Sequence, residues 1–347
     1  MPLSKIKDKG LRIIVIVGPT SSGKSELAVQ LAKKFHGEII SGDSRQIYRR
    51  LDLGTGKVAG HWMAGHPERR EGSLKQKTYF YKSIPHHLID FQNPTRQYSA
   101  GRFQTAARKK IVEIIKRGNL PILCGGTMHW IDAVVYNQNI PEVKPNLKLR
   151  AKLEKQSADA LFRRLTKLDP TRASTIDKFN KRRLIRALEI VISTGRPVPL
   201  LPWRGEMSAL ADREVGTKNY SALWLGLTLP QKTLYKKIDG RLKQRIKQGM
   251  IKEVKKLHDG FRVSPRKAPR QSALSWKRLE SFGLEYKFIS LFLQKKITHE
   301  EFVTQLSFAI KHYSKRQMTW WKKNQEIIWI KPDINKAVKL TNKFLKT

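Results

Sequence analysis

Residues 18–25 read GPTSSGKS, which has the GxxxxGK[ST] spacing of a phosphate-binding loop. An apolar run at residues 13–17 precedes the loop, and an amphipathic helical pattern follows it. A glycine-rich turn in this context aims backbone N–H groups and the positive end of a helix dipole at one point, where anionic oxygens bind. We therefore expect phosphate contacts from Gly18, Pro19, Thr20, Ser21, Ser22, Gly23, Lys24 and Ser25.

Two side chains of this loop have separate expected tasks. Lys24 is predicted to reach the outer phosphates, and the Ser25 hydroxyl is predicted to bind Mg²⁺. The loop alone does not decide whether a phosphoryl group is transferred from the site or a diphosphate leaves it.

Two further polar residues follow predicted strands. Asp43 comes after a strand predicted over residues 38–41, and Thr127 ends the segment LPILCGGT. Because open α/β sheets bind ligands at the carboxyl ends of their strands, we expect both residues to lie near the phosphate loop. Taken alone, Asp43 fits a catalytic carboxylate and a turn residue or helix N-cap equally well.

The elements that must position these residues alternate between strand and helix over the first third of the chain. HHLIDF is a third predicted strand, and a helix is expected between Ser99 and Gly118. The predicted fold class is α/β, with a P-loop NTPase-like parallel sheet flanked by helices. We expect residues 1–141 and 217–347 to form this core, and residues 142–216 to form a helical insertion.

The core resumes with a strand predicted over residues 224–229 and one long helix over 232–257. A close contact is expected at Gly240, because glycine weakens a helix interior by about 1 kcal/mol relative to alanine. Lys237, Arg241 and Arg245 recur at four-residue spacing, as either a solvated helix face or an anion-binding stripe.

The charge of the whole chain indicates a polyanionic partner. Its 347 residues include 70 Lys and Arg against 28 Asp and Glu, for a formal charge of +42. Nucleic acid is the first candidate partner, and a generally basic surface is the alternative. The single cysteine excludes an intrachain disulfide and fits a reducing cytoplasm. The first 17 residues fit neither a signal peptide nor a membrane span.

Seven blocks together resemble the tRNA dimethylallyltransferase family, whose members are also called tRNA isopentenyltransferases or IPP transferases. The blocks are GPTSSGKSELA, EIISGDSRQIYRRLDLGTGK, PHHLID, YSAGRF, GGTMHW, RLIRALEI and KRQMTWW, in the family's order between Ile14 and Trp321. The resemblance implies transfer of a dimethylallyl group from dimethylallyl diphosphate to the exocyclic N6 amine of an adenosine. In this family that adenosine lies directly 3′ of the anticodon in tRNAs that read codons beginning with U.

The resemblance also implies roles for individual residues. Asp43 matches the family's catalytic aspartate, and Thr127 matches a residue beside the target base and the diphosphate. Lys237 and Arg241 match basic residues that bind the diphosphate opposite the loop, while Gln231 stands where the family often has arginine. The implied tRNA contacts are Asp43, Ser44, Arg45, Gln46, Thr127, Lys148, Arg182, Arg183, Arg186 and Arg270, and the helical insertion would grip the anticodon stem.

One block departs from the family pattern. Where many members carry GYRQ or GYKE, this chain reads APRQSALSWKRLESFGLEYKF, so Trp276 or Lys277 is an alternative to Arg270 as a tRNA contact. His86 and His87 are interpreted as structural, because neighbouring strand residues point to opposite faces. Trp320 is interpreted as a packing residue rather than a base-stacking platform.

Three other functions compete with the tRNA prenyltransferase: a P-loop small-molecule kinase, an RNA-binding ATPase or non-catalytic RNA module, and a prenyltransferase for free adenine nucleotides. The segment PILCGGT offers no acid of the kind that holds Mg²⁺ in kinases, and the basic surplus favours polymeric RNA. We therefore expect a cytoplasmic, Mg²⁺-dependent monomer that acts on the tRNA anticodon stem-loop and dimethylallyl diphosphate, with no membrane association.

Overall fold

The apolar runs of the N-terminal third become neighbouring strands of one sheet. A computed structural model of the chain describes residues 11–64, 77–199, 220–260 and 273–347. Its eight-stranded sheet has the order β3-β4-β5-β2-β6-β1-β7-β8. The strands are β1 Arg12–Val17, β2 Gly37–Ser41, β3 His61–Ala64, β4 Lys77–Tyr81, β5 Ile84–His87, β6 Leu120–Cys124, β7 Ser221–Leu227 and β8 Ile328–Ile330.

The predicted parallel sheet is confirmed for its central part. Strands β5, β2, β6, β1, β7 and β8 pair in parallel, whereas β3 and β4 join the β5 edge in antiparallel pairing. All residues of β2 and β6, and five of the six in β1, are buried. These strands are therefore covered on both faces, which is why they read as continuous apolar runs.

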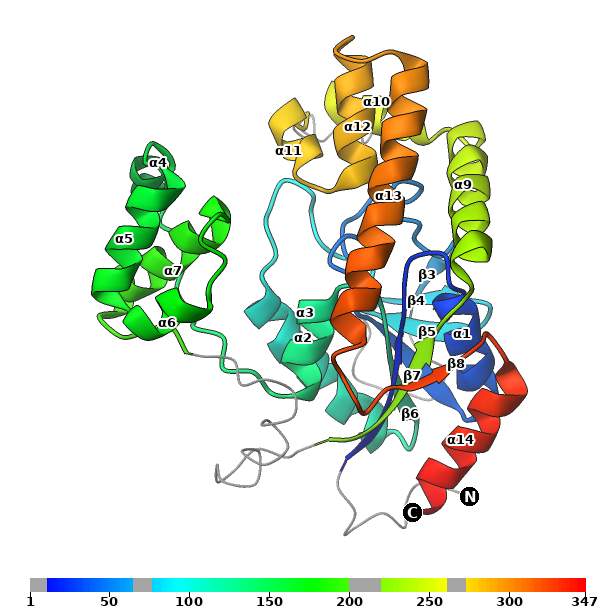
Figure 1. Ribbon diagram of the computed structural model, residues 1–347. Helices are drawn as coiled ribbons and strands as arrows, with labels where there is room; N and C mark the ends of the chain where they lie inside the picture. The colour runs from blue at the N-terminus through cyan, green and yellow to red at the C-terminus, as the bar shows by residue number, and fades with distance from the viewer. Residues whose placement is uncertain (1–10, 65–76, 200–219, 261–272) are drawn as a thin grey trace. The chain divides into compact units, whose positions relative to one another are not determined.

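Helices cover both faces of the sheet, as predicted (Figure 1). The helices α1 Lys24–Lys34 and α14 Ile334–Lys346 share one hydrophobic core with the sheet. The other face is covered by α2 Ala100–Lys116 and α3 Met128–Val135, and Ser99 caps α2 as predicted. The remaining helices of this part are α9 Gln231–Lys247, α10 Met250–Asp259, α11 Trp276–Glu280, α12 Leu284–Leu293 and α13 His299–Trp321.

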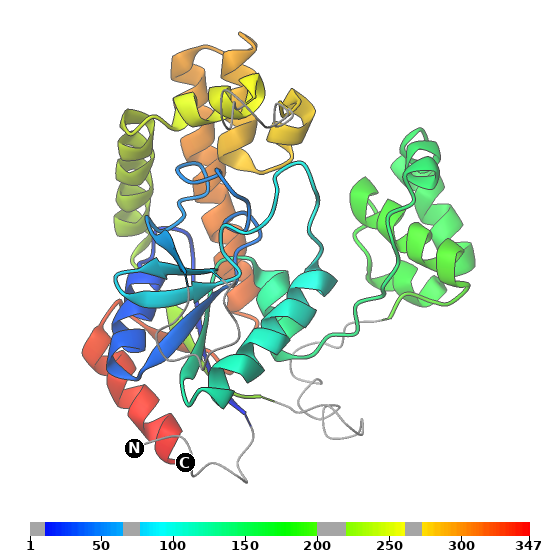
Figure 2. The same ribbon diagram turned by 180° about the vertical axis from the view of Figure 1, so that it is seen from behind.

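The chain divides into two compact units, Met1–Val135 with Glu214–Thr347, and Tyr136–Arg213. The second unit is helical, with its own core of leucines around Leu161, Leu165 and Leu184. Its helices are α4 Leu147–Glu154, α5 Ala158–Leu168, α6 Pro170–Thr175 and α7 Lys181–Thr194, and each begins after a side-chain N-cap. The green helices of Figure 2 are this unit, which the chain enters and leaves as an insertion in the sheet-containing unit.

Three local predictions need correction. The predicted long helix is two helices, because the chain turns at Gly249, whose φ is 101°. Only the start of HHLIDF is a strand, since Leu88 and Asp90 adopt positive φ values that end β5. The close contact predicted at Gly240 is not made by any described residue, since an added Cβ would meet none of them within 4 Å.

Among the described residues, no helix combines the length and the apolar character needed to cross a lipid bilayer.

Candidate functional site

Three loops meet where β1, β2 and β6 end. The strand order β2-β6-β1 makes these strands neighbours, so the phosphate loop, the Asp43 turn and the Thr127 turn share one edge of the sheet. The Thr127 N–H donates to the Gly42 carbonyl over 3.2 Å. A Cβ at Gly125 would lie 2.2 Å from the same carbonyl oxygen, so only glycine permits this approach.

Asp43 closes its own turn with one carboxylate oxygen. Its Oδ1 accepts the N–H groups of Arg45, at 2.8 Å, and Gln46, at 3.4 Å. No described residue donates a hydrogen bond to the second oxygen, Oδ2. The Thr127 hydroxyl accepts the Ser44 N–H over 2.9 Å and so ties the two turns together. Asp43 is thus a turn residue with one carboxylate oxygen left for another partner.

The phosphate loop surrounds a half-buried lysine. Lys24 Nζ donates to the Pro19 carbonyl over 2.6 Å, so the ammonium folds back over its own loop. Burial lowers the pKa of Lys24 to about 8; the positive charge of Arg241 adds to this effect, whereas Cys124 and Asp43 oppose it. An anionic ligand bound beside Lys24 would raise this pKa again, because an adjacent negative charge stabilises the protonated form.

Arg241 of α9 belongs to the same electrostatic neighbourhood. Its Nη2 donates to the Gly56 carbonyl over 3.1 Å. Burial and neighbouring Arg245 lower the pKa of Arg241 to about 10, whereas Glu285 and Asp43 oppose the shift. The charges of Lys24, Asp43 and Arg241 therefore act on one another in the structure.

The three basic residues predicted to share one face of α9 lie in three different environments. Lys237 is exposed, Arg241 is half-buried, and Arg245 is 9% exposed. Arg245 Nη1 lies 3.2 Å from the Glu285 carboxylate and donates to the Gly54 carbonyl. The solvated-face interpretation is therefore wrong for Arg245, which is buried with a counter-ion.

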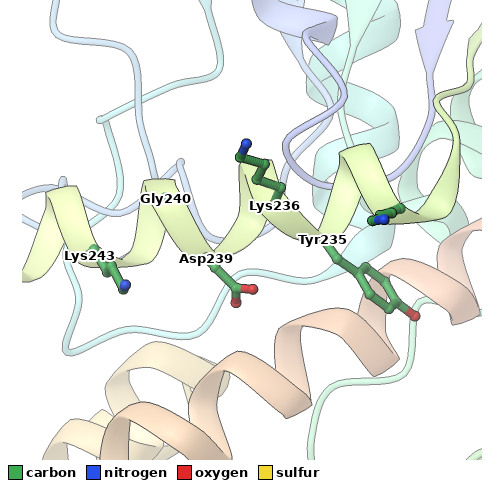
Figure 3. Close-up of a pocket in the computed structure, with 6 residues that line it drawn as sticks. Tyr235, Lys236, Asp239, Gly240 and Lys243 are labelled. Atoms are coloured by element: carbon green, nitrogen blue, oxygen red, sulfur yellow. The ribbon is translucent and has the colours of Figure 1, made fainter.

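Another face of α9 borders a shallow, open pocket of about 470 Å³. Figure 3 labels five of the α9 residues that line it, Tyr235, Lys236, Asp239, Gly240 and Lys243. Lys232 lines it as well. Asp239 is held there by Ser307 and Lys311 of α13, at 2.6 and 2.7 Å. None of the pocket's lining residues belongs to the three loops or is Lys237 or Arg241, so this pocket is separate from the candidate site.

Two residues of α13 complete the site and were not singled out from the sequence. Gln317, 2% exposed, accepts the Thr20 N–H at 2.8 Å and donates to the Gly126 carbonyl at 2.9 Å. Tyr313 lies one helical turn earlier and contacts the same carbonyl at 3.4 Å. Burial, with the charge of Asp43, raises the pKa of Tyr313 to about 12. The spacing of four within HYSKRQMTWW was the available signal that both residues share one helix face.

The expected tRNA contacts fall into separate regions. Ser44, Arg45 and Gln46 lie in the turn after β2, beside Asp43 and Thr127. The helical unit carries Lys148, Arg182 and Arg183, all exposed, and Arg186, which forms a 2.6 Å ion pair with the buried Glu189. Arg270 lies outside the described residues.

The residues interpreted as structural have internal partners. His87 Nε2 lies 2.5 Å from Glu38, and Arg117 and Asn119 also bind that carboxylate. His86 contacts the Ile84 carbonyl, and burial lowers the His86 pKa to about 4. Trp320 donates its indole N–H to Asp132 over 2.8 Å. These contacts tie strands and helices together.

The donor set at the phosphate loop fits a metal that is held mainly by substrate. No group of three or more His, Cys, Asp or Glu side chains in the described part of the chain could hold a metal ion. The Ser25 hydroxyl, at the exposed start of α1, is the expected protein ligand. Mg²⁺ accepts this arrangement, since it commonly retains water and takes its other oxygens from bound phosphates.

Two family models match the chain. The model described as IPP transferase matches residues 46–324, and the model described as isopentenyl transferase matches residues 11–67. Relatives named tRNA dimethylallyltransferase match nearly the whole chain. The protein from Anoxybacillus flavithermus is 35% identical, with 92% of this chain and 90% of that protein covered. The protein from Carboxydothermus hydrogenoformans is 35% identical, with 96% of each covered.

Solved structures agree with these matches. The tRNA isopentenylpyrophosphate transferase from Bacillus halodurans superposes with a TM-score of 0.60 at 32% identity, covering 97% of this chain and 96% of that chain. A eukaryotic dimethylallyltransferase described as acting on tRNA superposes with a TM-score of 0.70 at 25% identity, covering 96% of this chain and 79% of that chain. The similarity therefore includes both sequence and fold.

Proposed function

The chain belongs to the IPP transferase family and is a tRNA dimethylallyltransferase, and we propose that it acts on one defined adenosine. It transfers the dimethylallyl group of dimethylallyl diphosphate to the N6 amine of the adenosine 3′ of the anticodon, in tRNAs reading codons that begin with U. The observation that carries the proposal is the meeting of three loops, with a phosphate cradle, a carboxylate and a hydroxyl at one sheet edge.

Asp43 is proposed as the general base. The exocyclic amine of adenine is a weak nucleophile because its lone pair is delocalised into the ring, so an acceptor for its proton assists attack. As the bond from N6 to the first carbon of the dimethylallyl group forms, the bond from that carbon to the diphosphate oxygen breaks. Oδ2 of Asp43 receives the N6 proton, while Oδ1 stays in its turn. Thr127 is proposed to hydrogen-bond the base or the diphosphate, and the contact of its hydroxyl with the Asp43 turn supports this role.

The leaving diphosphate gains negative charge as its bond to carbon breaks. The backbone N–H groups of the phosphate loop, Lys24, Lys237 and Arg241 are proposed to stabilise that charge. Ser25 would hold Mg²⁺, which supplies further charge neutralisation when bound. Lys24 and Arg241 support this role because burial disfavours their charged forms in the free protein, and the negative charge of a bound diphosphate would compensate both.

Polymeric tRNA is the proposed acceptor. An anticodon-loop adenosine is already unpaired, so turning it into the site costs less than extrusion from a duplex. Arg45 and Gln46 beside Asp43, together with the exposed Lys148, Arg182 and Arg183, are proposed to contact the RNA. Location with tRNA in the cytoplasm, and action as a monomer, are parts of the same proposal.

The test is a transfer assay with two acceptors. The protein is incubated with Mg²⁺ and dimethylallyl diphosphate, in one sample with unmodified tRNA and in another with AMP. The RNA is digested and examined by mass spectrometry for prenylated adenosine. We expect product only with tRNA. Product only with AMP would indicate a nucleotide prenyltransferase, and hydrolysis of added ATP with no prenyl product would indicate phosphoryl chemistry.

A further inference from the structure

The segment Asp52–Lys57, called here the Asp52–Lys57 loop, presents backbone carbonyls to the arginines of α9. The Gly56 carbonyl accepts from Arg241 Nη2 at 3.1 Å, and the Gly54 carbonyl accepts from Arg245 Nη1 at 3.2 Å. Gln46 Nε2 also donates to the Gly56 carbonyl, at 3.3 Å. The loop therefore contacts both a proposed diphosphate ligand and the turn that carries Asp43.

A single carboxylate on α10 holds the other side of this loop. Glu253 Oε2 accepts the N–H groups of Asp52 and Leu53 at 3.0 and 2.8 Å. Its Oε1 accepts the Gly54 N–H at 3.1 Å and the Tyr286 hydroxyl at 2.7 Å. Three successive backbone N–H groups directed at one anion form a nest, so the loop backbone is organised around the Glu253 charge.

Packing leaves the loop little freedom at two points. A Cβ at Gly54 would lie 2.5 Å from the Tyr286 ring, and a Cβ at Gly56 would lie 2.4 Å from Arg241 Nη2. Part of the loop also borders a half-open cavity of about 420 Å³, together with Arg241 and Arg245. On that side the described residues leave open space beside the loop. The hydrogen bonds at Glu253 hold the start of the loop, and Lys57, which binds Asp52 and Asp90 at 2.6 Å, holds its end.

We propose that Glu253 is a positioning residue that acts through the Asp52–Lys57 loop to set the guanidinium of Arg241 for the diphosphate. By fixing Gly54, the carboxylate fixes Gly56 two residues later, and the Gly56 carbonyl aligns Arg241. Arg241 has a long side chain, and alignment before binding reduces the conformational entropy lost when the diphosphate arrives. The inference rests on the proposed function of Arg241 as a diphosphate ligand.

Glu253→Gln separates this role from simple side-chain packing, because the two side chains have nearly the same shape. Each carboxylate oxygen of Glu253 accepts two donors. An amide has one oxygen, so its NH₂ group must face either the pair Asp52 and Leu53 or the pair Gly54 and Tyr286. Tyr286 can rotate its hydroxyl to accept instead, but a backbone N–H cannot. At least one loop N–H therefore loses its partner.

The decisive experiment is a double-mutant cycle. Wild type, Glu253→Gln, Arg241→Ala and the double variant are compared for kcat and KM with dimethylallyl diphosphate at saturating tRNA. We expect Glu253→Gln to lower kcat/KM for the diphosphate by about tenfold, the effect of one lost charge-assisted hydrogen bond. In the Arg241→Ala background the same change should cost less than about threefold, because residues that act through one another are not additive.

A second measurement does not depend on turnover. The affinity for inorganic diphosphate is measured by calorimetry. We expect Glu253→Gln to weaken this affinity in the wild-type background and to change it little in the Arg241→Ala background. Tyr286→Phe is the matched control: it removes one donor from Glu253 and keeps all three loop N–H contacts, so its effect should be several times smaller. Thermal unfolding of each variant confirms that it is folded.

The outcomes distinguish the inference from its premise. A wild-type protein with no transfer activity would overturn the proposed function. An active wild type in which Glu253→Gln costs the same factor with and without Arg241 would overturn the positioning role alone. If Glu253→Gln does not fold, Glu253→Asp supplies the cycle with Arg241→Ala, because the shorter side chain keeps the charge but draws the carboxylate away from the three loop N–H groups. An equal cost of Glu253→Asp in both backgrounds would again contradict the inference.

Discussion

At the residue scale, Asp43 combines a structural and a proposed chemical task in one carboxylate. Oδ1 closes the turn after β2 by accepting two backbone N–H groups, so removal of the whole side chain would loosen the loop as well as remove the base. Asparagine keeps an oxygen for the turn and lacks the basic carboxylate. Comparing Asp43→Ala with Asp43→Asn therefore separates the role of Asp43 in the turn from its proposed role as catalytic carboxylate, the two interpretations that the sequence left open.

We predict that Asp43→Asn lowers the transfer rate by about 10²-fold to 10⁴-fold, the usual contribution of a general base. Its affinity for tRNA should stay within a few-fold of wild type, because the turn persists. Asp43→Ala should lose transfer to a similar extent and also unfold at a lower temperature. Single-turnover rates and filter binding with unmodified tRNA check this. Equal loss of tRNA binding and transfer in Asp43→Asn would argue against the role as base.

Lys24 gives a pH prediction. Burial lowers its pKa to about 8 in the free protein, and only the protonated form attracts diphosphate. Because kcat/KM reports ionisations of the free enzyme, kcat/KM for dimethylallyl diphosphate should fall as pH rises through about 8. Diphosphate binding followed by calorimetry should fall over the same range. In Lys24→Arg the guanidinium stays charged, so the binding that remains should be flat between pH 7 and 9. An unchanged falling limb in that variant would assign the ionisation to another group.

At the element scale, α13 links two of the loops that form the site. Gln317 joins the phosphate loop at Thr20 to the turn at Gly126 through one buried amide. Both partners are backbone groups, so the Gln317 side chain helps to set the distance between the two loops. Strand β6 alone does not fix this spacing, because its last residue, Cys124, lies before the turn.

We predict that Gln317→Leu destabilises the protein by about 1–3 kcal/mol, because the Thr20 N–H loses its acceptor while Tyr313 still contacts the Gly126 carbonyl. It should also raise KM for dimethylallyl diphosphate, because the Thr20 end of the phosphate loop is released. Urea unfolding and steady-state kinetics measure the two effects. The control is Lys315→Ala, an exposed position of the same helix, which should change neither. If Gln317→Leu has wild-type kinetics but reduced stability, the role of Gln317 is purely structural.

The elements that could be predicted from the sequence are those with local signals. Strands β1, β2 and β6 are apolar runs followed by glycine or polar residues, and parallel pairing then brings Asp43 and Thr127 beside the phosphate loop. The burial of Arg245 could not be predicted, because its counter-ion Glu285 is 40 residues away. The same holds for Glu253, whose three backbone partners lie about 200 residues earlier. Helical periodicity carries no information about such distant contacts.

At the scale of the whole molecule, the charge of +42 far exceeds what a small diphosphate requires. A long polyanion uses many cations at once, and each phosphate contact releases counterions, so affinity for tRNA should fall steeply with salt. Affinity for dimethylallyl diphosphate should respond much less, because it has only a few charges. The helical unit contributes to this basic surplus through exposed side chains that have no part in its leucine core.

Within that unit, the structure distinguishes Arg186 from three other basic residues that the sequence groups with it. Lys148, Arg182 and Arg183 are exposed, whereas Arg186 pairs with the buried Glu189 and also donates to the Val143 carbonyl. Changing the three exposed residues to alanine should weaken tRNA binding and reduce the slope of log affinity against log salt by up to about three. KM for dimethylallyl diphosphate and thermal stability should stay unchanged.

Arg186→Ala is the matched comparison, and it should behave differently. It removes one of two arginines that neutralise Glu189, so the helical unit should unfold at a lower temperature even without RNA. Its salt slope should change by about one at most, the effect of a single phosphate contact. A triple variant with the wild-type slope would mean that the helical unit does not contact tRNA phosphates through these residues. The basic residues that bind RNA would then have to lie elsewhere in the chain.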